Sequence, residues 1–523
     1  MRGFSGPTFA LRAGSLIIAA AALSLVLRSD LEMAHRPVVE DGYYVFTVAR
    51  NIATGHGITV DGAHLTNGFQ PLFTFLSVPC FIGAGANPYT AIRLVLFLHW
   101  LIFCATAYLI GAIARDSLFA KEEEGRAVVF WWVVFLYLSS VLIFIVNFNG
   151  LETGLLLGMY ALAWRYYQSR GIETTRNLLG FGALLGVLIM TRVDALFFLV
   201  AIALGILLRP GQDKSVRRLV RTGMLCVSAF LVSSPWWLFN KIYFGSFMPT
   251  SGKAYRSWIT PEDLSRPEIQ ERLRDGAEAF LRPLYPVVYL GQNTFEGLTI
   301  AFVRIVLIAG TCAFLWKKRH QIAGPEFLGE HAHPQSRRTL EFGRWLFVAM
   351  FFVAIIYTLS FSASWFYTRY FMPAAVVAIP LIGIAAYAAG SGRMWLSRLV
   401  PLALLVPILW VVVSLHKSTF QSEFITEQIQ LVTEKVPPED AVAAFQSGTL
   451  GYFRERVLNL DGKVNPMAVD RRPDLLEYVQ SQGVRWLCDY PKPIEEILGT
   501  ENLEKNGWKI VGKNNRFTLY HRE

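Results

Sequence analysis

Long apolar runs recur along the whole sequence, and they constrain the fold more than any other feature. A helix needs about 20 mainly apolar residues to cross a hydrocarbon core of about 30 Å. The chain has 523 residues, of which 53% are hydrophobic and only 17% are charged, and its mean hydropathy is +0.39. A soluble protein carries roughly a quarter charged residues. We therefore predict a mainly α fold, a polytopic transmembrane helix bundle.

The apolar runs predict about eleven transmembrane helices. The expected segments are residues 10–27, 91–114, 127–146, 154–167, 177–190, 195–208, 219–238, 298–316, 345–361, 374–389 and 399–415. The first segment has the basic start of a signal peptide, but no small-x-small cleavage site follows, which favours a retained helix. Residues 177–208 would form one helix of about 48 Å, too long for a simple span. We therefore expect two short helices that meet at residues 191–194.

The composition changes after the last apolar run. Short β-type runs occur at residues 441–445, 457–460, 484–488, 508–511 and 517–520, with one helical stretch at 474–482. Such alternation is typical of a small α/β domain. We therefore divide the chain into a transmembrane module, residues 1–415, and a C-terminal part, residues 416–523, that holds a linker and this domain.

The distribution of basic residues predicts the orientation in the membrane. Arginine and lysine gather in alternate loops, which the positive-inside rule places in the cytoplasm. These loops are residues 115–126, 165–176, 209–221, 317–344 and 393–398. The other loops, including the long one after the first helix, should lie outside with the C-terminal domain. The net charge of +10 therefore fits membrane topology better than nucleic-acid binding, and the five cysteines show neither metal spacing nor a disulfide framework.

The expected outer loops carry acids, bases and aromatic residues. Charges this close to the membrane are costly unless they pair or line a wet cavity, so we expect them to converge. A carboxylate there can act as a general base or bind a metal, and an arginine can hold a phosphate. Two candidates also have simpler interpretations, His56 as a turn residue and Asn67 as a helix cap. The candidate residues are Glu40, Asp41, Tyr44, Arg50, His56, Asn67, Gln70, Asn149, Glu152, Arg192, Asp194, Lys253, Trp365, Arg369 and Tyr370.

Several motifs in these loops share one family resemblance. The first loop reads Glu-Asp-Gly-Tyr-Tyr-x5-Arg from Glu40 to Arg50, then Gly-His-Gly at 55–57 and Thr-Asn-Gly-Phe-Gln-Pro-Leu at 66–72. Later loops read Asn-Gly-Leu-Glu-Thr at 149–153, Thr-Arg-Val-Asp at 191–194 and Tyr-Phe-Gly-x3-Pro-x3-Lys at 243–253. Together they resemble the outer loops of GT-C type glycosyltransferases, integral membrane enzymes that use polyprenyl-phosphate sugars. Gly-Tyr-Phe at 451–453 and Leu-Asp-Gly at 460–462 are similar to the outer C-terminal domain of some members.

The resemblance implies a mechanism. A carboxylate at the end of the first helix deprotonates an acceptor hydroxyl, which attacks the anomeric carbon of a hexosyl or pentosyl donor with inversion while polyprenyl phosphate leaves. The family more often has aspartate at the first position, so Glu40 is a departure, and the choice between Glu40 and Asp41 stays open. The resemblance also implies that Arg192, Lys253 and Arg369 bind the phosphate, with Tyr370 as a hydrogen-bond donor. It further implies that Glu152 and Asp194 orient the acceptor or bind a metal.

The resemblance also implies partners and a location. The acceptor is a glycan, a lipid or a protein, and the expected location is a bacterial inner or plasma membrane in envelope glycan biosynthesis. No cofactor follows with certainty, because family members differ in their need for a divalent cation. Two other functions stay open. A transporter or flippase of lipid-linked saccharides would place ionisable residues near mid-membrane and often has internal repeats. A membrane anchor that presents the C-terminal domain would not need acids in several outer loops.

Overall fold

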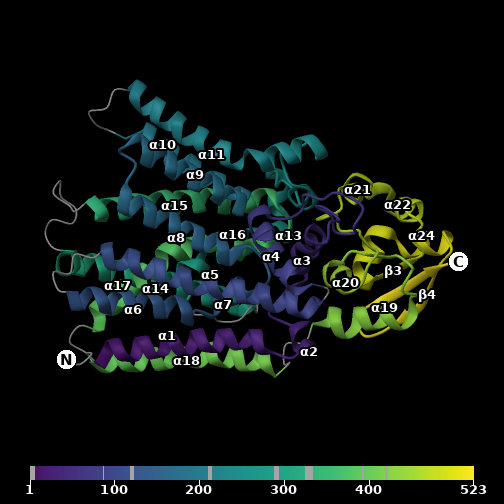
Figure 1. The fold of residues 1–523 in the computed structure, drawn as a ribbon, viewed down its shortest axis with the longest axis horizontal. Coiled ribbons are helices and arrows are strands. Elements are labelled where there is room, and N and C mark those ends of the chain that lie inside the picture. Colours follow the sequence, from purple (N-terminus) through teal and green to yellow (C-terminus); the bar gives the residue numbers. More distant parts are fainter. Residues whose placement is uncertain are drawn as a thin grey trace.

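A long helical bundle with a small α/β domain at one end makes up the protein (Figure 1). The computed structural model describes residues 6–85, 87–117, 123–209, 215–287, 294–323, 334–390, 394–417 and 422–523. The bundle runs away from the N-terminus, and the α/β domain covers its far end. This architecture confirms the predicted fold class.

The bundle helices run roughly parallel to its long axis (Figure 1). They are α1 (Gly6–Ser24), α5 (Pro88–Ser117), α6 (Glu123–Ser139), α7 (Val141–Phe148), α8 (Thr153–Arg170), α9 (Thr175–Thr191), α10 (Leu196–Leu207), α11 (Ser215–Phe244), α14 (Thr294–Ala323), α15 (Pro334–Ser360), α17 (Ala375–Gly390) and α18 (Met394–His416). All eleven expected segments lie on these helices. Six helical stretches of the described chain are long and apolar enough to cross a membrane, or seven if α6 and α7, bent by 61°, form one span. The chain is therefore an integral multi-pass membrane protein.

The long segment at residues 177–208 is broken, as expected. α9 ends at Thr191, Arg192 has an extended backbone with φ −160° and ψ 131°, and a 3-10 turn at Val193–Ala195 leads into α10. Both helices are apolar but shorter than the six spans. The break places two polar residues, Arg192 and Asp194, at the end of the bundle and not in its middle.

Two glycines on α9 let this helix lie close to α11. A Cβ at Gly182 would be 2.7 Å from the Leu225 carbonyl oxygen, and one at Gly186 would be 2.5 Å from the Ala229 carbonyl oxygen. Lipid offers no hydrophobic force to drive helix association, so helices in a membrane associate through close packing. Small residues four positions apart allow this packing.

The bundle end beside the N-terminus is held by ion pairs between the basic loops and scattered acids. Arg165 Nη1 lies 2.6 Å from Asp116, and Arg209 Nη2 lies 2.9 Å from Glu341. Most of these side chains are partly exposed, so each pair contributes about 1 kcal/mol or less. The described parts of the basic loops 115–126, 165–176, 209–221 and 317–344 therefore meet at one end of the bundle.

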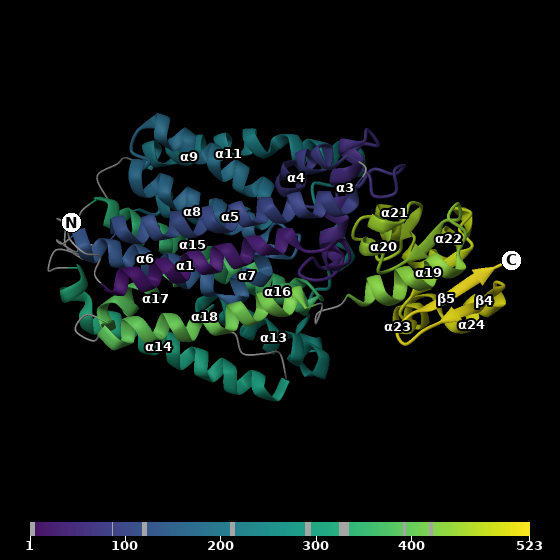
Figure 2. The ribbon, with the colours of Figure 1, turned by 60° about the horizontal axis from the view of Figure 1, so that its bottom comes forward.

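The opposite end is built from short helices. They are α2 (Asp30–Met33), α3 (Glu40–Ala53), α4 (Pro71–Ala84), α12 (Thr250–Ala254), α13 (Pro267–Leu284) and α16 (Tyr367–Phe371). Pro71 begins α4, where its missing N–H costs nothing. These helices belong to the expected outer loops, and they lie at the bundle end that carries the α/β domain (Figure 2).

The α/β domain contains a five-stranded sheet in the order β2-β1-β3-β5-β4. Its strands are β1 (Val442–Ala444), β2 (Val457–Asn459), β3 (Trp486–Asp489), β4 (Trp508–Lys513) and β5 (Thr518–Arg522), and its helices are α19 (Gln430–Lys435), α20 (Gly448–Phe453), α21 (Pro466–Asp470), α22 (Leu475–Ser481), α23 (Pro491–Pro493) and α24 (Thr500–Lys505). β1 pairs in parallel with β2 and β3, whereas β5 pairs antiparallel with β3 and β4. Alternate strand residues enter two different cores, Ala443 and Leu487 on one face and Val442 and Cys488 on the other. The sheet is thus covered on both faces, and each predicted β-type run overlaps one of its strands.

We expect Gly68→Ala to loosen the α/β domain. A Cβ at Gly68 would overlap the backbone carbonyl of Lys463, so one of the two backbones must move. The variant should lose about 1–3 kcal/mol of stability, seen as a lower melting temperature and faster proteolytic release of the domain. Gly223→Ala is the matched control, because a Cβ there meets nothing within 4 Å and alanine favours a helix. Equal melting temperatures for the two variants would contradict this close contact.

Candidate functional site

Six charged side chains at the domain-bearing end lie together, and we call them the charged cluster. The cluster consists of Asp41, Glu152, Arg192, Asp194, Arg369 and Lys463, whose side chains are between 1% and 19% exposed. The cluster contains three carboxylates and three cations, and a fourth carboxylate, Asp461, lies 3.2 Å from Lys463. Five of the six were predicted from four separate outer loops, and the structure brings those loops together. The sixth, Lys463, comes from the α/β domain.

The start of α3 places Asp41 against the second outer loop. The Val39 N–H donates to the Asn149 carbonyl oxygen at 3.1 Å. A Cβ at Gly42 would be 2.8 Å from that same oxygen, so only glycine allows the helix this close. Carboxylates are also favoured in the first turn of a helix, where the backbone dipole is positive. The Glu-Asp-Gly sequence therefore fixes the position of both acids.

Asp41 faces two cations. Its Oδ1 lies 2.9 Å from Lys463 Nζ, and its Oδ2 lies 3.6 Å from Arg369 Nη1. Burial alone would raise the pKa of Asp41, but the charges of Lys463 and Arg369 outweigh it and lower the pKa below its ordinary value. Asp41 is therefore ionised at neutral pH and able to accept a proton.

Arg192 organises the rest of the cluster. It donates from Nε to Asp194 Oδ1 at 3.1 Å and also pairs with the second oxygen of that carboxylate. Its Nη1 donates to the Arg369 carbonyl oxygen at 3.0 Å and lies 3.9 Å from Glu152. The guanidinium stacks on Tyr370, 4.6 Å from the ring centre. Arg192 is thus committed to protein partners and holds the segment that carries Arg369.

Glu40, next to Asp41, has a different environment. Its carboxylate accepts from the Gly448 N–H at 2.5 Å, from the Thr449 N–H at 2.9 Å and from the Thr449 hydroxyl. These donors belong to α20, which lies beside α3 (Figure 2). Burial raises the pKa of Glu40 to about 7, against the opposing effect of these hydrogen bonds. Glu40 therefore joins the α/β domain to the bundle.

We expect the attachment of the α/β domain to weaken as pH rises from about 4.5 to about 7. Because the folded pKa of Glu40, about 7, exceeds the ordinary value of 4.5, its contribution favours the folded state at low pH and is lost between about 4.5 and 7. Glu40→Gln resembles the protonated acid and should remove roughly 3 kcal/mol of this pH dependence. The buried Asp489, whose pKa burial also raises to about 7, retains its own slope in the variant. Melting temperatures at pH 5 and 8 measure the difference, with Glu501→Gln, an exposed site, as the control. A wild-type slope in Glu40→Gln would contradict the assignment.

Tyr44 and Arg50 also contact the α/β domain. The Tyr44 hydroxyl lies 3.2 Å from Ser447 Oγ and 3.1 Å from Asn459 Nδ2. Arg50 Nη1 donates to the Tyr452 carbonyl oxygen at 2.7 Å. These two predicted substrate-binding residues therefore have protein partners across the domain interface.

Other predicted site residues lie outside the cluster. Asn67 is buried, where it donates to Asn240 Oδ1 at 3.1 Å and accepts from the Thr250 N–H at 3.0 Å. It does not cap α4, because the N-cap residue of that helix is Gln70, which makes no side-chain cap bond. Asn149 Oδ1 accepts from the Leu151 N–H within its own loop at 3.0 Å.

For the remaining predicted residues, the structure describes no contact with the charged cluster. His56 is exposed and its ring lies 2.8 Å from the Thr54 hydroxyl, as expected of a turn residue. Lys253 is exposed on α12. The backbone of Trp365 is in a 3-10 turn, but its side chain lies outside the described part of the chain. Lys253 is therefore a weaker candidate for phosphate binding than Lys463.

Sequence reasoning missed Lys463 and Thr449. Both lie in the α/β domain, whose composition gave no sign that it reaches the site. The one available signal was Leu-Asp-Gly at 460–462, directly before Lys463. Asp461 accepts from the Lys463 N–H at 2.8 Å and lies 3.2 Å from its Nζ, so the motif holds this lysine in place.

The carboxylates of the charged cluster lie beside cations and not beside one another. Among the described residues, no three His, Cys, Asp or Glu side chains gather closely enough to hold a metal ion.

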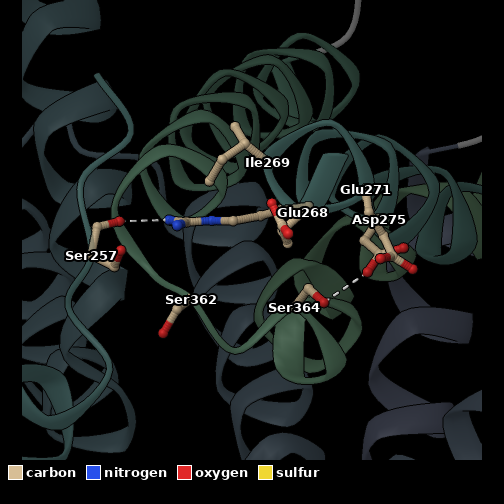
Figure 3. A pocket seen from close by; sticks show the side chains of 8 residues that line it. Ser257, Glu268, Ile269, Glu271, Asp275, Ser362 and Ser364 are labelled. Atoms are coloured by element: carbon tan, nitrogen blue, oxygen red, sulfur yellow. Dashed lines mark hydrogen bonds between the residues drawn. The ribbon is translucent and has the colours of Figure 1, made fainter. Parts of the chain in front are cut away.

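A polar hollow of about 410 Å³ lies at the same end of the protein (Figure 3). It is lined by Ser257, Glu268, Ile269, Glu271, Arg272, Asp275, Ser362 and Ser364. Arg272 donates to the Ser257 carbonyl oxygen at 2.9 Å, and Ser364 donates to Asp275 at 2.7 Å. None of the residues predicted from the sequence lines this hollow, so it is distinct from the charged cluster.

Comparison with solved structures identifies the fold. ArnT from Cupriavidus metallidurans matches with a TM-score of 0.56 in the apo state and 0.55 bound to undecaprenyl phosphate, at 12% identity, covering 97% of this chain and 98% of that one. The Archaeoglobus fulgidus oligosaccharyltransferase in its apo form matches with a TM-score of 0.50 at 12% identity, covering 98% of this chain and 74% of that one. The chain has a GT-C-type fold. Within this GT-C-type chain, residues 416–520 match a domain of unknown function, DUF8728. A search of curated protein sequences finds no match.

Proposed function

We propose that this protein is a glycosyltransferase that moves a sugar from a polyprenyl-phosphate donor to an acceptor hydroxyl. The observation that carries the proposal is the placement of an ionised carboxylate, Asp41, beside Lys463 and Arg369 at one end of a GT-C-type bundle. Asp41 takes the proton of the acceptor hydroxyl. The hydroxyl oxygen then bonds to the anomeric carbon with inversion, and the bond from that carbon to the phosphate oxygen breaks, its electron pair leaving with polyprenyl phosphate.

Asp41 supports this role better than Glu40 does. Glu40 already accepts three hydrogen bonds from α20, so its oxygens are occupied. Asp41 accepts one hydrogen bond, from Lys463 at 2.9 Å, and its second oxygen faces Arg369 at the longer distance of 3.6 Å. A general base contributes about 10²- to 10⁴-fold to a rate, provided that it reaches the proton it removes.

The cations of the cluster suit the leaving group. A polyprenyl phosphate gains negative charge as the glycosidic bond breaks, and fixed cations in a dry site stabilise that charge. Arg369 lies on the Asp41 side of the cluster, whereas Arg192 lies behind it and positions it. The solved ArnT binds undecaprenyl phosphate, which supports a donor of this class here.

The site should face the outer side of a bacterial inner or plasma membrane. The basic loops at the opposite end of the bundle support this orientation through the positive-inside rule. A cysteine placed at the exposed Glu501, in a cysteine-free background, should react with an impermeant reagent added to intact spheroplasts. Labelling only after lysis would reverse the orientation.

The proposal is tested with purified protein in nanodiscs. We expect saturable binding of undecaprenyl phosphate and, with a panel of polyprenyl-phosphate hexoses and pentoses, cleavage of one donor that depends on an acceptor. The acceptors to test are a glycan, a lipid and a peptide. Failure to bind undecaprenyl phosphate would overturn the donor class. Movement of intact lipid-linked saccharide across a liposome without cleavage would favour the alternative, a transporter or flippase.

A further inference from the structure

Lys463 occupies an unusual place for a residue of a soluble domain. It follows β2 in the α/β domain, yet its ammonium group reaches the charged cluster and its side chain is only 11% exposed. Three aromatic rings surround the ammonium group, those of Tyr44 at 5.9 Å, Tyr255 at 5.6 Å and Phe366 at 5.6 Å. The site is therefore completed by a second domain.

Residues other than this lysine also attach the domain to the bundle. Glu40 binds the start of α20, and Arg50 donates to the Tyr452 carbonyl oxygen. Tyr452 in turn donates its hydroxyl to the Pro88 carbonyl oxygen at 2.7 Å. Moreover, a buried ion pair often adds little net stability, because each charge must leave water. A buried lysine at this position therefore needs a role other than attaching the α/β domain to the bundle.

Of the two cations beside Asp41, Arg369 is incompletely satisfied. Arg369 approaches the carboxylate at 3.6 Å, beyond hydrogen-bond distance, and its buried Nε has no hydrogen-bond partner in the described part of the chain. Lys463 has more partners, since it is shared between Asp41 at 2.9 Å and Asp461 at 3.2 Å and also contacts the Tyr255 hydroxyl. An added phosphate would supply acceptors for both cations.

We propose that Lys463 is a ligand of the donor phosphate, and that donor binding moves its ammonium group from Asp41 to the phosphate. This inference rests on the proposed function. An arriving phosphate adds negative charge, which Lys463 and Arg369 must balance together with the carboxylates already beside them. Asp461 stays beside the lysine and keeps it at the site during the exchange. The α/β domain thereby becomes part of the donor site.

The exchange has a chemical consequence for Asp41. Once Lys463 turns to the phosphate, the carboxylate loses its closest cation and binds a proton more tightly, so the base strengthens only after the donor is present. Other charged and titratable groups stay in place around it. These are Glu40 and Tyr44 on α3, Arg369 and Tyr370 on α16, Tyr255 after α12, Asp461 in the α/β domain, and Glu152 and Arg192 behind Arg369.

The test measures binding of undecaprenyl phosphate to the full-length protein in nanodiscs. Lys463→Met should weaken binding by about 10- to 100-fold, the effect of one lost charged hydrogen bond. Lys463→Arg should bind within a few-fold of wild type, and Lys492→Met, at an exposed lysine of the same domain, should bind as wild type does. Lys463→Met binding equal to wild type would overturn the inference and leave the proposed function standing. Absence of binding by the wild type would overturn both.

A second measurement needs no variant. Amine-reactive labelling of the wild type, read by peptide mass spectrometry, compares Lys463 with Lys492 as undecaprenyl phosphate is added. Modification of Lys463 should change several-fold while that of Lys492 stays constant. Constant modification of both lysines at saturating lipid would overturn the inference even if Lys463→Met does not fold.

Discussion

Asp41→Asn should reduce glycosyl transfer by about 10²- to 10⁴-fold, because the amide cannot take the proton of the acceptor hydroxyl. The amide keeps the size and shape of the carboxylate, so the fold should persist. Binding of undecaprenyl phosphate should not weaken, since the neutral amide no longer competes with the phosphate for Lys463 and Arg369. The measurement is kcat/KM for acceptor-dependent donor cleavage, with lipid binding measured on the same sample.

Glu40→Gln is the matched control for that variant, since it makes the same chemical change one residue away. Its carboxylate faces α20 and not the cations, so transfer should stay within a few-fold of wild type. The reverse result, full activity in Asp41→Asn and loss in Glu40→Gln, would assign the base to Glu40. Full activity in both would remove the acidic pair from the chemistry altogether.

The pH dependence of the transfer activity tests the same assignment independently. A general base must be ionised, so activity should fall as pH drops through the pKa of Asp41, which Lys463 and Arg369 lower against the effect of burial. In kcat/KM for the donor, which reports the enzyme before Lys463 turns to the phosphate, Lys463→Met removes one of these cations and should move that limb to higher pH. A limb that does not move would show that another group limits the rate.

Much of the architecture follows from local sequence. Apolar runs bury themselves in lipid whatever their neighbours are, so all eleven segments could be located as helices. Their lengths were harder to interpret, because α6 and α7 bend at Ser140 and α9 and α10 are short. The β-type runs of the C-terminal part could also be located, since residues on a strand alternate between two cores. Their order in the sheet could not, because it depends on pairing between distant segments.

The candidate site could be predicted only in part, for a physical reason. Charges next to a membrane need partners, which made the convergence of Asp41, Arg192 and Arg369 predictable from their loops alone. Asn67 and Arg50 are just as polar, but their partners lie far away in sequence, at Thr250 and Tyr452, and no local pattern indicates them. Lys463 was missed for the same reason, since its role depends on how the α/β domain docks.

Arg192→Met should be the most destabilising single change in the charged cluster. The Arg192 side chain is 1% exposed and neutralises Asp194 at the break between α9 and α10. Removing it leaves the carboxylates of Asp194 and Glu152 buried without this cation, at a cost of about 3–5 kcal/mol. The expected readout is a sharp fall in melting temperature and in yield of monodisperse protein. Arg266→Met is the matched control, because Arg266 is 67% exposed in its pair with Asp263 and should cost about 1 kcal/mol or less.

A double variant separates the lost pair from the stranded charge. Arg192→Met with Asp194→Asn should recover part of the stability, because the carboxylate that Arg192→Met strands is then neutral. The recovery should not extend to ligand binding. Arg192 Nη1 holds the Arg369 carbonyl oxygen at 3.0 Å, so Arg369 loses its support in both variants and affinity for undecaprenyl phosphate should fall. Stability equal to that of Arg266→Met would contradict the structural role of Arg192, and unchanged affinity in a folded variant would contradict its positioning role, since the cation that binds phosphate depends on this buried arginine for its place.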